Sequence, residues 1–220
     1  MPRRNMKSLF RKYSFIGYAL ITLSQLWLYS LNLRTDGLYE RVTINSLEWI
    51  GSHIILLMGA ILIFPVTLAL KDYLEGKSIY LIYIATTLTF LGAAALIGQS
   101  ILDMYLVPLF KDQTSNSAYT ALEQVQSNNF IKFLCYDLIA SWLLGQVLFI
   151  TALFTKKNYP KWALCLLMIG VLMVIFGDSI HDLLERSSYI LISVALLPIF
   201  KLKALINMSA RSKAGHSNNH

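Results

Sequence analysis

Residues 47–70, LEWIGSHIILLMGAILIFPVTLAL, decide the fold class of this chain. The stretch is apolar almost throughout, and no ionisable residue follows His53 within it. A helix rises ~1.5 Å per residue and the hydrocarbon core of a bilayer is ~30 Å thick, so about 20 apolar residues cross it. Because unpaired backbone groups are costly in lipid, the stretch is predicted to be a transmembrane helix.

Similar apolar runs recur along the chain and are separated by short charged segments. The predicted spans are residues 13–33, 47–70, 78–110, 130–154, 162–181 and 188–205. None shows the alternation of a membrane barrel strand. The predicted fold is therefore all-α, an integral membrane bundle of six transmembrane helices. A basic tail, residues 1–12, precedes the bundle, and its first span is expected to be retained rather than cleaved. A polar tail, residues 206–220, follows and is predicted to be disordered.

The composition agrees with a membrane protein. Of the 220 residues, 56% are hydrophobic and only 14% are charged, whereas an ordinary soluble domain carries about 25% charged residues. The formal net charge is +7. The basic residues lie in loops and tails beside apolar runs, so the predicted partners are the lipid bilayer and anionic lipid headgroups on the cytoplasmic side, and no nucleic acid is expected.

The basic residues also predict the orientation. Cytoplasmic loops of membrane proteins are enriched in Lys and Arg. With six spans, the segments rich in these residues all fall on one side of the membrane: residues 3–12, 71–77, 156–161 and 201–213. Both termini are therefore predicted to be cytoplasmic, and a five-span arrangement would place the two basic tails on opposite sides.

Polar and ionisable residues of the spans gather near their predicted outer ends. A charged side chain within a span costs about 2.5–3.5 kcal/mol on insertion scales, so such residues are candidates for a site. Counting ~1.5 Å per residue from the span ends places Asp137 roughly 10 Å deep and His53 roughly 9 Å deep. The candidate ligand-binding residues are His53, Gln99, Asp103, Asp137, Asp178 and His181.

Helical spacing suggests how these residues group. Gln99 and Asp103 are four residues apart, and Asp178 precedes His181 by three and Asp182 by four, so each set is expected to share one helical face. If the faces converge, they form a cavity open to the outside. Imidazole and carboxylate groups bind divalent metals and also act as general acids and bases.

Several functions fit this pattern. The leading hypothesis is a membrane protein that binds a ligand, a lipid or a partner at the outer polar cavity. One alternative is a metal-dependent membrane hydrolase with an Asp/His site, and another is an accessory subunit of a membrane complex. An ion-pair network that only holds the bundle together is a fourth interpretation. A divalent metal is the one cofactor that the candidate side chains suggest, and whether the chain is an enzyme stays open.

Two further patterns concern packing. Tyr119, Leu122 and Val125 recur at helical spacing in the longest loop, which predicts a short amphipathic helix on the bundle or the membrane surface. The small residues of the third span are expected to let another helix approach closely. They are Gly92, Ala94, Ala95 and Gly98, and Ala94 and Gly98 form a small-xxx-small pair.

Residues 143–178, LLGQVLFITALFTKKNYPKWALCLLMIGVLMVIFGD, carry a resemblance. An apolar run, a basic turn with Pro160 and Trp162, and a glycine-containing span follow one another. This order resembles uncharacterised bacterial six-span membrane proteins, and the resemblance implies a location in the bacterial cytoplasmic membrane with no particular activity. Span-borne His and Asp are also similar to the ceramidase and adiponectin-receptor-like membrane hydrolases. The paired histidines of those enzymes have no counterpart in the predicted spans, and their seventh span is missing.

Overall fold

The computed structural model describes residues 16–35, 37–74, 79–111 and 113–217, and the side chains of Asp178 and of residues 200–217 lie outside that description. All regular structure in these ranges is helical. In chain order the elements are α2 (Ile16–Arg34), α3 (Leu38–Ile44), α4 (Ser46–Leu74), α5 (Ile79–Phe110), α6 (Ser115–Ser127), α7 (Asn129–Cys135), the 3-10 helix η1 (Asp137–Ile139), α8 (Ala140–Phe154), α9 (Lys161–Ile180) and α10 (Asp182–Ser217).

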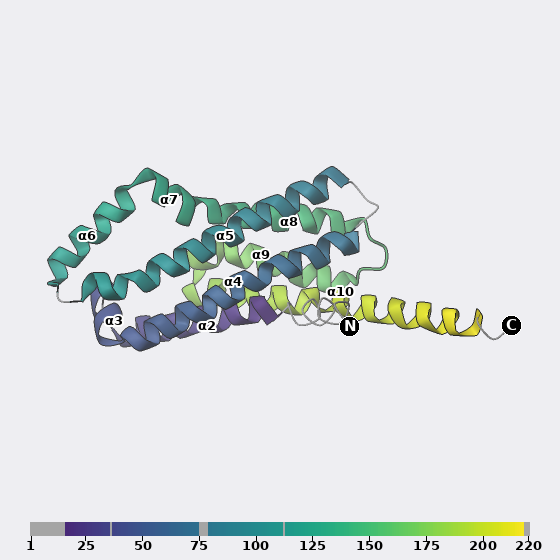
Figure 1. Cartoon of the computed structure of the whole chain (residues 1–220), viewed down its shortest axis with the longest axis horizontal. Helices are drawn as coiled ribbons and strands as arrows, with labels where there is room; N and C mark the ends of the chain where they lie inside the picture. Colours follow the sequence, from purple (N-terminus) through teal and green to yellow (C-terminus); the bar gives the residue numbers. More distant parts are fainter. Residues whose placement is uncertain (1–15, 36, 75–78, 112, 218–220) are drawn as a thin grey trace.

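The long helices form a bundle (Figure 1). Helices α2, α4, α5, α8, α9 and α10 run roughly along its long axis, and the short helices α3 and α6 lie at one end, called here the α3/α6 end. Neighbours pack in the order α9, α10, α2, α4, α5 and α8, and α8 also contacts α9. A large apolar core, which includes Tyr18, Ile63, Trp142, Phe149 and Ile192, fills the bundle. The all-α prediction is confirmed for the described residues.

Three of the described helical stretches are long and apolar enough to cross a membrane: Ser46–Leu74, Ile79–Phe110 and Asn129–Phe154. They match the predicted spans 47–70, 78–110 and 130–154 within a few residues. A shorter apolar stretch, Lys161–Gly177, lies in the predicted fifth span. The count of six spans and the orientation stay predictions. The predicted basic tail and the first residues of the first span lie outside the described ranges.

Glycines let pairs of helices approach until their backbones touch. A Cβ atom on Gly92 of α5 would lie 2.4 Å from the Cβ and 2.5 Å from the backbone N of Trp142 in α8. One on Gly59 of α4 would lie 2.8 Å from the carbonyl oxygen of Gly17 in α2, and Gly170 of α9 meets α10 in the same way. Such contacts are typical of membrane helices, because small residues there permit close van der Waals packing.

Only part of the predicted small-residue surface makes this contact. Gly92 does, whereas Ala94 is exposed. A Cβ on Gly98 would lie 3.5 Å from Cys135 Sγ, an ordinary van der Waals distance. The close approach of α5 to α8 is therefore centred on Gly92 and not on the Ala94–Gly98 pair.

The predicted fourth span is interrupted. Helix α7 ends at Cys135, Tyr136 adopts a non-helical backbone conformation (φ −124°, ψ −58°), and the three-residue η1 precedes α8. The predicted span 130–154 is therefore a helical stretch with a local break at Tyr136. Its start is well defined, because the Asn128 side chain accepts hydrogen bonds from the backbone N–H groups of Phe130 and Ile131 and so caps α7.

The predicted amphipathic helix in the longest loop is confirmed as α6. Leu122 is buried there, whereas Val125 is half-buried and Tyr119 is more exposed. Leu122 belongs to a second apolar cluster at the α3/α6 end, formed with Val42, Trp49, Leu106, Phe110 and Ala118. Helices α3 and α6 therefore close this end of the bundle over α4 and α5. At the other end α10 continues through Ser217, so residue 205, the predicted end of the last span, lies inside a helix.

Candidate functional site

Two of the predicted site residues meet near the α3/α6 end. His53 lies in the second turn of α4 and Asp103 lies seven residues before the end of α5. The Nε2 atom of His53 is 3.5 Å from Oδ2 of Asp103. The His53 side chain is buried, with 2% of its surface exposed, whereas 18% of the Asp103 side chain is exposed. The carboxylate is therefore the member of the pair that a solute can reach.

The surroundings of His53 fix which ring nitrogen faces the carboxylate. Its Nδ1 atom lies 2.7 Å from the carbonyl oxygen of Trp49, one turn earlier in α4. A carbonyl only accepts hydrogen bonds, so Nδ1 carries a hydrogen. The Trp49 indole lies against the imidazole with ring centroids 4.5 Å apart. Its Nε1–H donates to the backbone oxygen of Asp103 at 2.8 Å and ties α4 to α5.

With Nδ1–H committed to a carbonyl, Nε2 is the ring atom that faces Asp103. The contact therefore joins a side chain of α4 to a side chain of α5.

Tyr136 and Gln126 complete this group, which we call the Asp103 site. The Tyr136 phenol lies near the Asp103 carboxylate, and the Gln126 side chain of α6 lies near the phenol. Tyr136 is the non-helical residue between α7 and η1. Neither Tyr136 nor Trp49 is among the site residues predicted from the sequence. The four-residue spacing of Trp49 and His53 was the available signal.

The other candidates on these helices lie apart from the pair. Gln99 is half-buried one turn before Asp103 in α5. Asp137 is exposed and begins the 3-10 segment. The sequence predicts a depth of roughly 10 Å in the fourth span, and the structure places the residue directly after the break at Tyr136. Whether Gln99 or Asp137 contacts a ligand stays a prediction.

The predicted shared face of Asp178, His181 and Asp182 is wrong. Helix α9 ends at Ile180, and His181 has an extended backbone (φ −168°, ψ 124°) before α10 begins at Asp182. The chain therefore reverses between Asp178 and Asp182. His181 is exposed, and its Nδ1 accepts the backbone N–H of Leu183 at 3.1 Å, which caps α10. The Asp178 side chain lies outside the described part of the structure.

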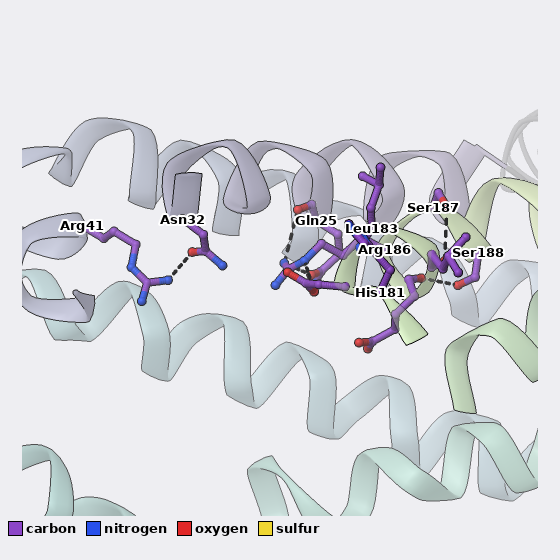
Figure 2. Close-up of polar contacts among 11 residues, drawn as sticks. Gln25, Asn32, Arg41, His181, Leu183, Arg186, Ser187 and Ser188 are labelled. Carbon is purple, nitrogen blue, oxygen red and sulfur yellow. Dashed lines mark hydrogen bonds and ion pairs between the residues drawn. The ribbon is translucent and has the colours of Figure 1, made fainter. Parts of the chain in front are cut away.

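A second polar group joins α2 to α10 (Figure 2). The Arg186 guanidinium donates to Oδ1 of Asp182 at 2.6 Å through Nε, and to Oε1 of Gln25 at 3.0 Å through Nη1. The same guanidinium lies 5.8 Å from the centroid of the Tyr29 ring, and the His181 ring lies 6.5 Å from that of Tyr29. Arg186 is not among the predicted site residues, because its spacing to Asp182 is visible in the sequence but its partner on α2 is not.

The structure thus places the described candidates in two groups on different helix pairs. The Asp103 site lies between α4 and α5 and contains His53, whereas His181 belongs with Arg186 between α2 and α10. Within the described side chains, no three His, Cys, Asp or Glu residues gather closely enough to hold a metal ion. The Asp103 site offers a partly exposed carboxylate, which can bind a positively charged or hydrogen-bonding group.

Comparisons with protein-family models, curated proteins and solved structures found no match to this chain. The resemblance of residues 143–178 to bacterial six-span membrane proteins therefore stays a prediction.

Proposed function

We propose that the chain is a six-span protein of the bacterial cytoplasmic membrane with both termini in the cytoplasm. Three helical stretches of sufficient length and apolar character support membrane insertion. The alternation of basic loops supports the orientation. The α3/α6 end then faces outward. Reporter fusions after Lys71 and Lys157 are expected to report a cytoplasmic position, and one at Ser115 an external position. An external signal at Lys157 would contradict six spans.

We propose further that the protein binds a ligand at the Asp103 site without catalysing a reaction. The observation that carries this proposal is the His53–Asp103 pair, in which a buried imidazole holds a partly exposed carboxylate. Ionisable side chains within membrane helices are energetically costly and mostly face the interior of the bundle, so such residues are candidate sites.

The charge of the site indicates the ligand class. Asp103 is acidic and partly exposed, whereas His53 is buried and lies against Trp49. The other neighbours, Tyr136 and Gln126, carry hydrogen-bonding groups and no formal charge. A ligand ammonium group could bind the exposed side of the Asp103 carboxylate. A cationic ligand group therefore fits better than an anionic one.

Thermal unfolding of the detergent-solubilised protein tests this proposal. Methylammonium chloride is the probe, sodium chloride at equal concentration controls for ionic strength, and Zn²⁺, Mn²⁺ and a chelator test for metal. Methylammonium is expected to raise the Tm of the wild type, because a ligand that binds only the folded state stabilises it. The rise should persist in Asp137→Asn, a matched carboxylate change at an exposed position, and disappear in Asp103→Asn.

The outcomes separate the alternatives. A Zn²⁺ or Mn²⁺ effect that disappears in Asp103→Asn would favour the metal-dependent interpretation instead. If no cation shifts the Tm of the wild type, the binding proposal fails and the pair serves only to hold α4 against α5. The hydrolase alternative has no supporting contact among the described side chains, because His53 and Asp103 are only two donors.

A further inference from the structure

A polar stripe runs along one face of α2. Tyr18, Thr22, Gln25, Tyr29 and Asn32 follow one another at intervals of four, three, four and three residues. This spacing places all five on the same side of a helix. Leucines and isoleucines occupy most of the other positions of α2, so the stripe is a specific feature in an otherwise apolar helix.

The outer part of the stripe is paired with polar groups. Arg186 of α10 donates to both the side chain and the backbone oxygen of Gln25, at 3.0 and 3.3 Å. Arg41 donates to Asn32 through its guanidinium. Figure 2 shows these two pairs one after the other along α2, with His181 beside Arg186. Polar contacts therefore continue inward from the α3/α6 end for about two helical turns.

The stripe becomes fully buried as it continues inward. Asn32, Tyr29 and Gln25 are half-buried, whereas Thr22 is 3% and Tyr18 0% exposed. The Tyr18 ring lies 6.0 Å from the Trp142 ring of α8, which in turn lies 5.7 Å from Tyr189 of α10. Three helices thus bring aromatic side chains with polar atoms to the innermost part of the stripe.

The polar atoms at this inner point lack partners within the described part of the chain. The Tyr18 hydroxyl faces the Trp142 indole, but Tyr18 Oη and Trp142 Nε1 each reach no partner in hydrogen-bonding geometry. Gln146 lies one turn after Trp142 on the same face of α8 and is 1% exposed. Both its Oε1 and its Nε2 are also without a described partner.

Such a cluster is unfavourable if it is empty. A buried polar group without a hydrogen bond destabilises a protein by about 1–3 kcal/mol, and most buried polar groups are satisfied by protein or by ordered water. Here four atoms on three neighbouring side chains lack partners together. They offer the indole N–H, one amide donor, one amide acceptor and a hydroxyl that does both.

We propose that Tyr18, Trp142 and Gln146 bind an uncharged polar group, either water or a small neutral solute, that enters from the α3/α6 end along the stripe of α2. The three side chains carry no charge, so a buried ion there would lack a counter-charge. Farther along α8 and α10 most of the described buried residues are apolar, including Phe149, Ile192 and Leu196, and Ser193 is the polar exception among them. The path therefore ends inside the bundle. This site is distinct from the Asp103 site and does not depend on it.

Hydroxyl-radical footprinting of the wild-type protein in lipid nanodiscs tests the proposal without any substitution. Radicals generated from bound water oxidise the side chains beside it. After each rate is normalised to that of the same residue in unfolded protein, Tyr18 and Trp142 should be oxidised several-fold faster than Phe149. Phe149 is the matched control, because it is aromatic, fully buried and on the same helix as Trp142. Equal normalised rates would overturn the proposal.

Acetamide, a small neutral amide, distinguishes the two occupants. If it lowers the oxidation of Trp142 more than that of exposed aromatic residues, which report its scavenging of radicals in solution, a neutral solute enters the site. If the fall is the same at both, water is the occupant. Both results agree with an uncharged ligand group. Iodide at equal concentration serves as the anionic comparison and should have no effect specific to Tyr18 and Trp142.

Gln146→Leu supplies a second measurement. In an occupied site it removes two ligand contacts, so the oxidation of Trp142 and the Tm should both fall. In an empty site it removes an unsatisfied amide, so the Tm should rise, which would count against the proposal. Gln124→Leu, at an exposed position of α6, controls for the change of residue type. If Gln146→Leu does not fold, the wild-type footprint still decides.

Discussion

The middle of the bundle and its α3/α6 end are held together by different contacts. In the middle, glycines bring backbones together, as at Gly92 against Trp142. At the α3/α6 end, side chains make the connections. Trp49 bonds to the Asp103 backbone, and Tyr39 stacks on Phe110 with ring centroids 5.8 Å apart and donates to the Gln113 carbonyl at 2.7 Å.

The difference has a physical reason. Within lipid there is little hydrophobic force between helices, so their association depends on close van der Waals fit. At the end of the bundle polar groups can be charged, solvated or bound to a ligand. The middle is therefore expected to tolerate substitution poorly, and the α3/α6 end is where contacts can change when a ligand binds.

The largest expected effect is that of Gly92→Ala. The added methyl group would overlap the Trp142 backbone, so the whole of α8 has to move, and overpacking of this kind costs about 1–3 kcal/mol. We expect the upper part of that range in thermal or denaturant unfolding. Gly98→Ala on the same helix meets only an ordinary contact with Cys135 and should change stability little. Equal losses in both variants would contradict the glycine contact as the cause.

A smaller effect is expected for the His53–Asp103 pair. A double-mutant cycle with His53→Gln and Asp103→Asn should give a coupling free energy of about 1 kcal/mol, since contacting residues typically couple by about 0.5–3 kcal/mol. The unfolding free energies of wild type, both single variants and the double variant measure it. If the losses of unfolding free energy in the two single variants add up to the loss in the double variant, the His53–Asp103 contact contributes no interaction energy.

At the opposite end of the bundle, a substitution of Tyr159 measures how much a polar contact there contributes to stability, for comparison with the α3/α6 end. Its buried hydroxyl donates to the Ala195 carbonyl at 2.6 Å, so Tyr159→Phe should cost about 1 kcal/mol. Burial, with a smaller contribution from Tyr73, raises the pKa of the Tyr159 phenol above its usual 10.0.

The raised pKa gives this contribution a pH dependence. The unfolded phenol loses its proton first as the pH rises, so the stabilisation is complete below pH 10 and decreases above it. Unfolding of wild type and Tyr159→Phe between neutral and alkaline pH measures the difference. Above pH 10 the unfolding free energy of the wild type should fall more steeply than that of Tyr159→Phe. If the two curves run parallel, the pH dependence does not come from the Tyr159 phenol.

The smallest effect is expected for Asp137→Asn. The side chain is exposed, and exposed substitutions usually change stability by less than about 0.5 kcal/mol. Removal of its charge should leave the Tm equal or slightly higher. A large loss of stability would show that Asp137 has a partner that its exposure does not suggest.

The sequence by itself determined the helices. The apolar run 47–70 appears as α4 and the run 78–110 as α5, because a helix satisfies its backbone hydrogen bonds within one segment and its length follows from local composition. The amphipathic α6 was predictable for the same reason. The structure departs from the predicted helices at two local breaks. One is at Tyr136 within the fourth predicted span, and the other is at His181 between α9 and α10.

Only the tertiary structure decided which polar residues meet. Spacing placed Gln25 on α2 and Arg186 near the start of α10, but no local rule pairs residues 161 positions apart. The His53–Asp103 contact depends likewise on how α4 and α5 are rotated and shifted against each other. Those rotations are set by the fit of whole helix surfaces, such as Gly92 against Trp142, and van der Waals fit is a property of two surfaces together that neither segment carries alone.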